Sequence, residues 1–262
     1  MKHLGKSCYI LPLLLAAAGT AQAEGTWGDS LSTAVSDGKA SLDFRYRFEN
    51  VDQDGIKKDA TANTLRSRIT LETAPLSGFS ALIEVDDVTN IGSDDYNSTS
   101  NGNTQYPVIA DPEGTDINQG YFKYAGEEFA GILGRQRINH GNQRFIGGVS
   151  WRQNEQTYDS LRGTWSPIEI LKLDLSYVNN VSRIFGPDDG AQPADLKGDN
   201  LFFRADYQMA PNQKLAAYGY SLDFDPQRDY ASGKTTDNSG DTYGVEYSGK
   251  FDWFSITAAY AG

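Results

Sequence analysis

The sequence predicts an all-β fold, a transmembrane antiparallel up-and-down β-barrel, and three observations support it. Apolar and polar residues alternate in many segments, long and short connections alternate along the chain, and the segments have the length of bilayer-crossing strands. Only 39% of the residues are hydrophobic, and no apolar run reaches the roughly 18 residues that a spanning helix needs. The elements that we expect to cross the membrane are therefore strands.

The N-terminus has the pattern of a secretory signal peptide. Two lysines precede the apolar run YILPLLLAAAG, and the small residues Ala21-Gln22-Ala23 form a cleavage site. We therefore expect residues 1–23 to be removed and residues 24–262 to form the barrel. The single cysteine, Cys8, lies in the removed segment, so disulfides and thiolate chemistry are not expected in the mature chain.

The stretch LDFRYRFE, from Leu42 to Glu49, shows the alternation most clearly. Successive side chains of a strand point to opposite faces, so one face here is apolar and the other is charged. Burying such a charged face in a dry core costs several kcal/mol for each unpaired charge. In a water-filled barrel, the apolar face meets lipid and the charged face meets water, while closure of the sheet pairs the backbone.

The same pattern recurs to the end of the chain and predicts about 11 strands, each of roughly 8 to 10 residues. Their connections are long at one end of the strands and short at the other, as in outer-membrane barrels with short periplasmic turns and long external loops. The long connections are residues 50–62, 89–116, 139–156, 183–199 and 223–240, and the short ones are residues 74–78, 125–129, 166–170, 209–213 and 248–251.

An odd strand number is unexpected, because bacterial barrels of this kind have even numbers of strands. The last segment, ITAAYAG, also stops within its alternating pattern. We therefore expect the chain to be the N-terminal portion of a longer barrel.

Several arginines occur in i, i+2 pairs on the predicted inner face: Arg45 and Arg47, Arg66 and Arg68, and Arg135 and Arg137. In the segment GILGRQRI this assignment places Ile132 and Ile138 on the apolar outer face. Two guanidinium groups along one strand suit an anion or a sugar carboxylate. The alternative is that these arginines brace the wall by pairing with the acidic residues of the same face. The two roles are compatible, because rings of charged side chains can both brace a barrel and select the solutes that pass.

Residues 134–159 form the densest basic and polar segment, with Arg144, Phe145, Trp151 and Arg152 in its loop. Large aromatic and basic side chains are costly in a free loop, so we expect this loop to fold into the lumen as a constriction. The alternative is an ordinary surface loop.

Four stretches in this part of the chain resemble the alginate-export family of outer-membrane porins: DPEGTDINQGYFKY, GRQRI, NQRF and WRQNEQTYD. The resemblance spans about residues 42–186. It implies a monomeric barrel that passes an anionic polysaccharide through an arginine-rich pore. It also implies that Arg135, Arg137, Arg144 and Arg152 line that pore. The alternation of the first strands adds Arg45, Arg47, Arg66 and Arg68 to the expected lining.

Other classes of function have little support. The formal net charge of −12 argues against nucleic-acid binding. His140 has no adjacent serine for a hydrolase, and no metal or dinucleotide motif appears, so we expect no enzyme activity, metal or cofactor. The expected partners are outer-membrane lipid, lipopolysaccharide and an anionic small molecule or polysaccharide. Two alternatives remain: a non-conducting barrel that binds or adheres through its long loops, and a soluble periplasmic saccharide-binding β-protein.

Overall fold

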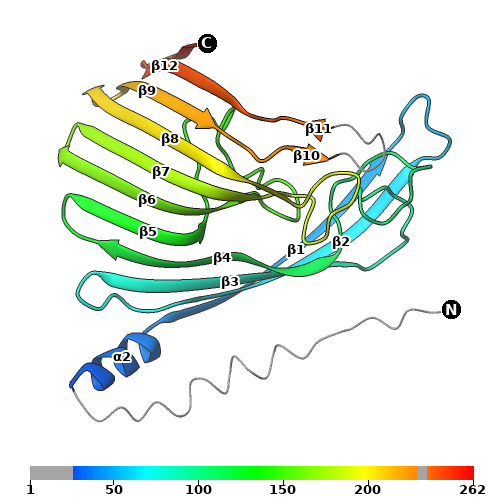
Figure 1. Cartoon of the computed structure of the whole chain (residues 1–262), viewed down its shortest axis with the longest axis horizontal. Coiled ribbons are helices and arrows are strands. Elements are labelled where there is room, and N and C mark those ends of the chain that lie inside the picture. The colour runs from blue at the N-terminus through cyan, green and yellow to red at the C-terminus, as the bar shows by residue number, and fades with distance from the viewer. Residues whose placement is uncertain (1–25, 229–234) are drawn as a thin grey trace.

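The computed structural model describes residues 26–228 and 235–262, and its main element is one antiparallel sheet of 11 strands. Neighbouring strands follow the chain order, which confirms the predicted all-β up-and-down meander (Figure 1). The strands are β1 (Lys39–Val51), β2 (Ala60–Glu72), β3 (Phe79–Asn90), β4 (Gly114–Ala125), β5 (Phe129–Gln136), β6 (Thr157–Ile168), β7 (Leu171–Ser182), β8 (Asp195–Ala210), β9 (Gln213–Leu222), β12 (Gly240–Lys250) and β13 (Ser255–Ala261).

The predicted asymmetry of the connections is present. Figure 1 shows the short turns at the left end of the strands and the longer loops at the right end. The last long loop contains a small separate hairpin of β10 (Gln227–Arg228) and β11 (Thr235–Thr236). One rim of the sheet therefore carries the long loops and the other carries only short turns.

Among the described residues, the two edge strands β1 and β13 are not paired with each other, so the sheet is a curved open wall. The idea that the chain is part of a longer barrel stays a prediction. The predicted signal peptide, residues 1–23, lies outside the described residues.

A helix that the sequence analysis did not predict precedes the sheet. Helix α2 (Thr26–Ser36) is short, has Asp29 in its first turn and is followed directly by β1. The carbonyl of Ala34 accepts a hydrogen bond of 2.8 Å from the backbone N–H of Ala74 in the first short turn. The described part of the chain contains no helix long and apolar enough to cross a bilayer.

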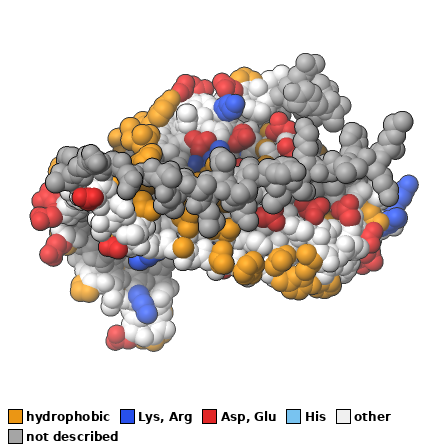
Figure 2. Space-filling model, turned by 90° about the horizontal axis from the view of Figure 1, so that it is seen from below, with side chains coloured by type: hydrophobic (Ala, Val, Ile, Leu, Met, Phe, Trp, Pro, Cys, Tyr) orange, Lys and Arg blue, Asp and Glu red, His pale blue; other side chains and the backbone are white. Residues whose placement is uncertain are grey.

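The apolar faces of the strands point outward. On β1 the side chains of Leu42, Phe44, Tyr46 and Phe48 are between 57% and 66% exposed, while Arg45 and Arg47 on the other face are partly buried. Large exposed hydrophobic side chains continue along the other strands, and Figure 2 shows groups of them on the face seen from below. A wall with this outer surface has the polarity that a bilayer requires.

The side chains of strand β5 point to other faces of the sheet than predicted. Its outward residue is Leu133, which is 59% exposed and lies beside Leu161 of β6. Ile132 is opposite Arg162 on the inner side, and Ile138 lies beyond the strand end and is fully buried. The assignment of Ile132 and Ile138 to the outer face was therefore wrong.

The cause of this error is local backbone geometry at Gly134. Its φ is +125°, and a Cβ atom there would lie 2.3 Å from the carbonyl oxygen of Gly120. Only glycine tolerates this close approach. Because the strand bends here and ends two residues later, a period-two pattern cannot be extended from Ile132 to Ile138.

The inner face carries two apolar clusters. The larger one forms where the loop after β5 packs on strands β6 to β9 and comprises Ile138, Ile146, Tyr158, Val178, Val181, Phe202, Tyr218, Tyr220 and Phe224. The smaller one joins the loop after β3 to the start of β2 and comprises Ala60, Ala62, Tyr96 and Ile109. Both clusters bind long loops to the wall.

The outward direction of β6 can be tested with Leu161→Arg. An arginine on the lipid face near the middle of the bilayer costs about 2–4 kcal/mol. We expect a smaller folded fraction when the protein is refolded into lipid vesicles over a urea series. Thr164→Arg is the matched control, because Thr164 lies opposite the buried Asp174 on the inner face. Equal losses in both variants would contradict the assignment of faces.

Candidate functional site

The loop between β5 and β6, residues 137–156, crosses the inner side of the sheet and rests on β1. The guanidinium of Arg45 donates to the backbone carbonyls of Ser150, Trp151 and Arg152 at 2.9, 2.6 and 3.1 Å. Arg45 and these carbonyls are more than 100 residues apart in sequence. The prediction that this loop folds inward is therefore confirmed.

Gln153 fixes the loop to the wall through its side chain. It is fully buried, and its amide donates to the hydroxyl and carbonyl oxygens of Thr64 on β2 at 2.9 and 3.1 Å. Its backbone N–H donates to a carboxylate oxygen of Asp111, which belongs to the preceding long loop. Its amide also donates to the carbonyl of Arg45 on β1 at 3.2 Å, so two long loops and two strands meet at this residue.

Glu155 provides the charged part of this attachment. Its carboxylate lies 2.5 Å from Arg137, 3.2 Å from Arg68 and 3.8 Å from Arg66. Glu84 of β3 lies beside it and pairs with Arg137 at 2.5 Å. Both carboxylates have side chains only 6% exposed, so this is a largely buried network of charge-assisted hydrogen bonds.

The pKa of Glu155 is lowered from its ordinary value. Burial, the largest single influence, acts to raise it. The hydrogen bond and the charge of Arg137, the charge of Arg68 and a hydrogen bond from Asn118 together outweigh that effect. Glu155 therefore stabilises the attached loop in its ionised form.

A second ionic group lies next to the loop tip. Asp111 is fully buried and faces Arg47 at 3.3 Å and Arg152 at 3.5 Å, while Glu49 pairs with the same two arginines. The exposed ring of Trp151 has the guanidinium of Arg152 4.2 Å and that of Arg47 5.2 Å from its centroid. The loop tip is therefore held by ion pairs and cation–π contacts together.

The structure brings together six of the eight arginines expected to line the lumen: Arg45, Arg47, Arg66, Arg68, Arg137 and Arg152. Six carboxylates accompany them: Asp43, Glu49, Glu84, Asp86, Asp111 and Glu155. The positive and negative charges of this group are equal in number, so the group has no formal net charge. Its contacts join residues of the loop to strands β1, β2 and β3 and hold the loop against the wall.

The other two predicted arginines lie elsewhere. Arg135 binds Asp159 of β6 through two hydrogen bonds of 2.7 and 3.0 Å and is two residues from the outward Leu133. Arg144 is exposed beside Phe145 on the part of the loop that faces β8 and β9. Neither joins the ionic group around Glu155.

The residues that sequence reasoning missed are mainly the carboxylates that pair with the arginines and the glutamine whose amide donates to Thr64. Asp111, Gln153 and Glu155 lie in stretches quoted for the family resemblance, but nothing local in the sequence distinguishes them from other polar loop residues. Their role becomes visible only when residues far apart in sequence are placed together.

No metal-binding group is apparent in residues 26–228 and 235–262, where no cluster of three or more histidine, cysteine or acidic side chains has suitable geometry. Asp86, which is followed by a second aspartate, is bound to Arg68 at 2.6 Å. His140 is buried, with Nδ1 3.3 Å from the hydroxyl of Tyr220 and Nε2 3.6 Å from Asp174.

Comparison with known proteins agrees with this architecture. The sequence model of the alginate export family matches residues 39–259, which extends beyond the stretches quoted above. No curated protein sequence gives a significant match.

Solved structures share the fold at low sequence identity. OccAB1 of Acinetobacter baumannii is 14% identical with a TM-score of 0.61, and the alignment covers 93% of this chain and 54% of that one. OccD3 (OpdP) of Pseudomonas aeruginosa is 12% identical with a TM-score of 0.59, covering 88% and 50%. OccAB2 of A. baumannii is 13% identical with a TM-score of 0.60, covering 87% and 68%. The chain thus spans about half the length of OccAB1 and OccD3.

The attachment of the loop can be tested with Glu155→Gln. Loss of a charged hydrogen-bond acceptor costs about 1.5–3 kcal/mol, which is about 10- to 150-fold in a local opening equilibrium. We expect amide hydrogen exchange in residues 146–156 to accelerate by that factor. Glu169→Gln, in an exposed short turn, is the control and is expected to leave exchange unchanged. Unchanged exchange in Glu155→Gln would show that Gln153 and Arg45 hold the loop without it.

The lowered pKa of Glu155 also predicts a pH dependence. A carboxylate whose pKa is lowered by folding stabilises the folded state at pH values above its ordinary pKa. This stabilisation is lost as the pH falls through the lowered, folded-state pKa. Exchange in the loop, corrected for its intrinsic pH dependence, is expected to be constant from about pH 7 to 5 and to rise below about pH 4. In Glu155→Gln this acid-induced rise is expected to be smaller, and an identical rise in both proteins would assign it to other carboxylates.

Proposed function

Since the chain belongs to the alginate export family, whose members are Gram-negative outer-membrane β-barrel proteins, we propose that it forms the wall and constriction of an outer-membrane channel. The solutes we propose are anionic small molecules or an acidic polysaccharide. Outer-membrane lipid would surround the wall, and lipopolysaccharide would contact its long external loops.

The observation that carries the proposal is the infolded loop. A loop that crosses the inner side of a wall whose outer face is apolar narrows a passage without blocking the lipid-facing surface. Its attachment is made of arginines, carboxylates and amides that bind one another, and Arg137 of this network has a side chain that is 29% exposed. This arrangement favours a hydrated, selective constriction over a packed hydrophobic core.

Preference for anions rests on the arginines Arg45, Arg47, Arg66, Arg68, Arg135, Arg137, Arg144 and Arg152. Around Glu155 the arginines are balanced by carboxylates, so the preference we propose is modest rather than strong. Selection would then depend on where individual cations are accessible. The proposal includes neither an enzymatic reaction nor a cofactor.

Single-channel recording in planar bilayers tests the proposal. We expect discrete conductance steps and a reversal potential that indicates anion preference across a salt gradient. Arg137→Gln removes the most exposed arginine of the Glu155 network and is expected to move the reversal potential toward cations. Lys57→Gln removes a positive charge from an external loop and is the control.

The other outcomes of this recording have defined meanings. Absence of conductance steps would exclude the channel and favour the alternative of a non-conducting barrel that binds or adheres through its long loops. Steps with an unchanged reversal potential in Arg137→Gln would mean that this arginine only braces the wall.

A further inference from the structure

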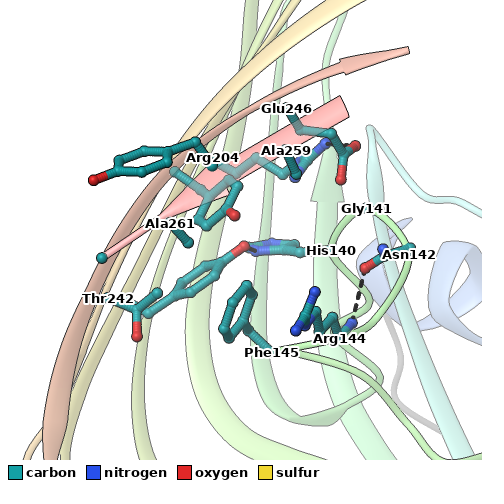
Figure 3. Close-up of a pocket in the computed structure, with 14 residues that line it drawn as sticks. His140, Gly141, Asn142, Arg144, Phe145, Arg204, Thr242, Glu246, Ala259 and Ala261 are labelled. Atoms are coloured by element: carbon teal, nitrogen blue, oxygen red, sulfur yellow. Dashed lines mark hydrogen bonds and ion pairs between the residues drawn. The ribbon is translucent and has the colours of Figure 1, made fainter. Parts of the chain in front are cut away.

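Hollows lie on both sides of the wall. The inner side has a cavity between the infolded loop and strands β8, β9, β12 and β13, lined in part by His140, Arg144 and Phe145 (Figure 3). The outer side has a groove of about 830 Å³ between helix α2 and strands β1 to β5. This volume falls in the range of ligand sites, and the channel proposed above makes no use of the groove.

Helix α2 forms one side of the groove, and its C-terminal end is fixed to the short-turn rim, where Figure 1 shows it. Ala34 is buried, and its carbonyl accepts a backbone hydrogen bond from the first short turn. A Cβ atom on Gly38 would lie 2.5 Å from the carbonyl oxygen of Glu72, so the chain leaves the helix in direct contact with β2. Leu31 and Val35, one turn apart, are 59% and 54% exposed. The helix therefore turns apolar side chains to its surroundings, as helices in a membrane interface do.

The floor of the groove is the apolar outer face of the wall. Leu71 of β2 lies opposite Ile83 of β3. Phe122 of β4 lies opposite Ala81 on one side and Leu133 on the other, and it is 73% exposed. Since this floor is continuous with the surface that faces lipid, the groove opens to the hydrocarbon of the membrane.

A glycine deepens the floor. Gly120 lies opposite Ile83 and two residues before the outward Phe122, so it belongs to the same face of the sheet. A Cβ atom there would meet only Ile117, at 3.4 Å, within a radius of 4 Å. The space that a side chain at this position would fill therefore belongs to the groove.

The rim end of the groove carries one positive and one negative charge. Lys39 and Glu72 are direct partners in the β1–β2 ladder, and both line the groove. Within residues 26–228 and 235–262, neither has an oppositely charged group within 4.0 Å. A zwitterionic headgroup complements this arrangement, because its phosphate suits the lysine and its ammonium suits the glutamate.

We propose that the groove binds one phospholipid with an ethanolamine headgroup. Lys39 donates to the phosphate and Glu72 accepts from the primary ammonium, while one acyl chain lies along the strands over Gly120 and against Phe122. The headgroup is then at the rim and the chain runs along the wall, which is the orientation of a lipid in its own leaflet. The short turns place this leaflet on the periplasmic side. The site depends on the outer-membrane location and not on conduction.

Native mass spectrometry of the purified protein in detergent tests the site with three probes of identical acyl chains: phosphatidylethanolamine, phosphatidylcholine and phosphatidylglycerol. One ethanolamine lipid is expected to bind per chain. It is expected to bind more tightly than the choline lipid, whose quaternary ammonium donates no N–H hydrogen bond, and than the glycerol lipid, which has no ammonium. Equal binding of the three lipids would overturn the headgroup assignment, and absence of bound lipid would overturn the site.

The headgroup contacts can be tested with Lys39→Gln and Glu72→Gln. Lys39→Gln is expected to weaken binding about fivefold, as for loss of one lysine beside lipid headgroups. Glu72→Gln is expected to reduce the preference for the ethanolamine lipid over the glycerol lipid. Lys250→Gln is the matched control, because Lys250 is an exposed lysine at the end of β12 on the same rim and lies outside the groove.

The position of the acyl chain can be tested with Gly120→Val, which fills the floor and is expected to weaken the binding of all three lipids. Gly163→Val is the matched control. Gly163 lies opposite the outward Leu175 on β6, outside the groove, and a Cβ atom there would come no closer than 3.4 Å to its neighbours. Equal losses in a variant and its control would overturn the proposal.

Far-UV circular dichroism establishes that each variant is folded. Unchanged binding in folded Lys39→Gln and Gly120→Val would overturn the proposal, and Lys39→Gln, at the exposed rim, decides alone if Gly120→Val does not fold. A dimer mass that disappears in Val35→Glu would assign the groove to a second copy of the chain and overturn the lipid site.

Discussion

The ion pairs of Glu155 are the interaction on which the inner architecture depends. A single carboxylate near the end of the infolded loop contacts arginines of β2 and the arginine at the start of the same loop. Both ends of the loop are therefore fixed to one point of the wall. Between these ends, the contacts of Arg45 and Gln153 hold the loop on β1 and β2, and the apolar cluster around Ile146 holds it on β6 to β9.

Such an attachment has a cost that the rest of the network must offset. Removing a charged group from water is unfavourable unless partners satisfy it with good geometry. Glu155 and Glu84 both accept hydrogen bonds from Arg137 and from the side-chain amide of Asn118. Arg68 also forms an ion pair with Asp86. Glu84, Glu155, Arg68 and Arg137 each have at least two oppositely charged neighbours within 4.0 Å, so the central charges of the network remain paired although they are buried or half-buried.

The features predictable from sequence are those set by neighbouring residues. The alternation of Phe44, Tyr46 and Phe48 with arginines defines the two faces of a strand, and loop lengths define the two rims. The pairing of Glu155 with Arg68 across 87 residues has no local signal and depends on the curvature of the wall. Helix α2 and the bend at Gly134 were missed because a short polar helix and a single φ angle leave little trace in hydrophobic periodicity.

The same reasoning explains why a count of arginines is a poor guide to selectivity here. An arginine beside a carboxylate contributes little field at a distance, because the two charges cancel over a few ångströms. The arginines that the alternating pattern makes most conspicuous, on β1 and β2, are those most fully balanced or bound to loop carbonyls. Arg144 belongs to no such pattern, yet it is exposed and has no acidic neighbour in the described chain. One loop thus produces a neutral, braced surface on its β1 side and an exposed cation on its β9 side.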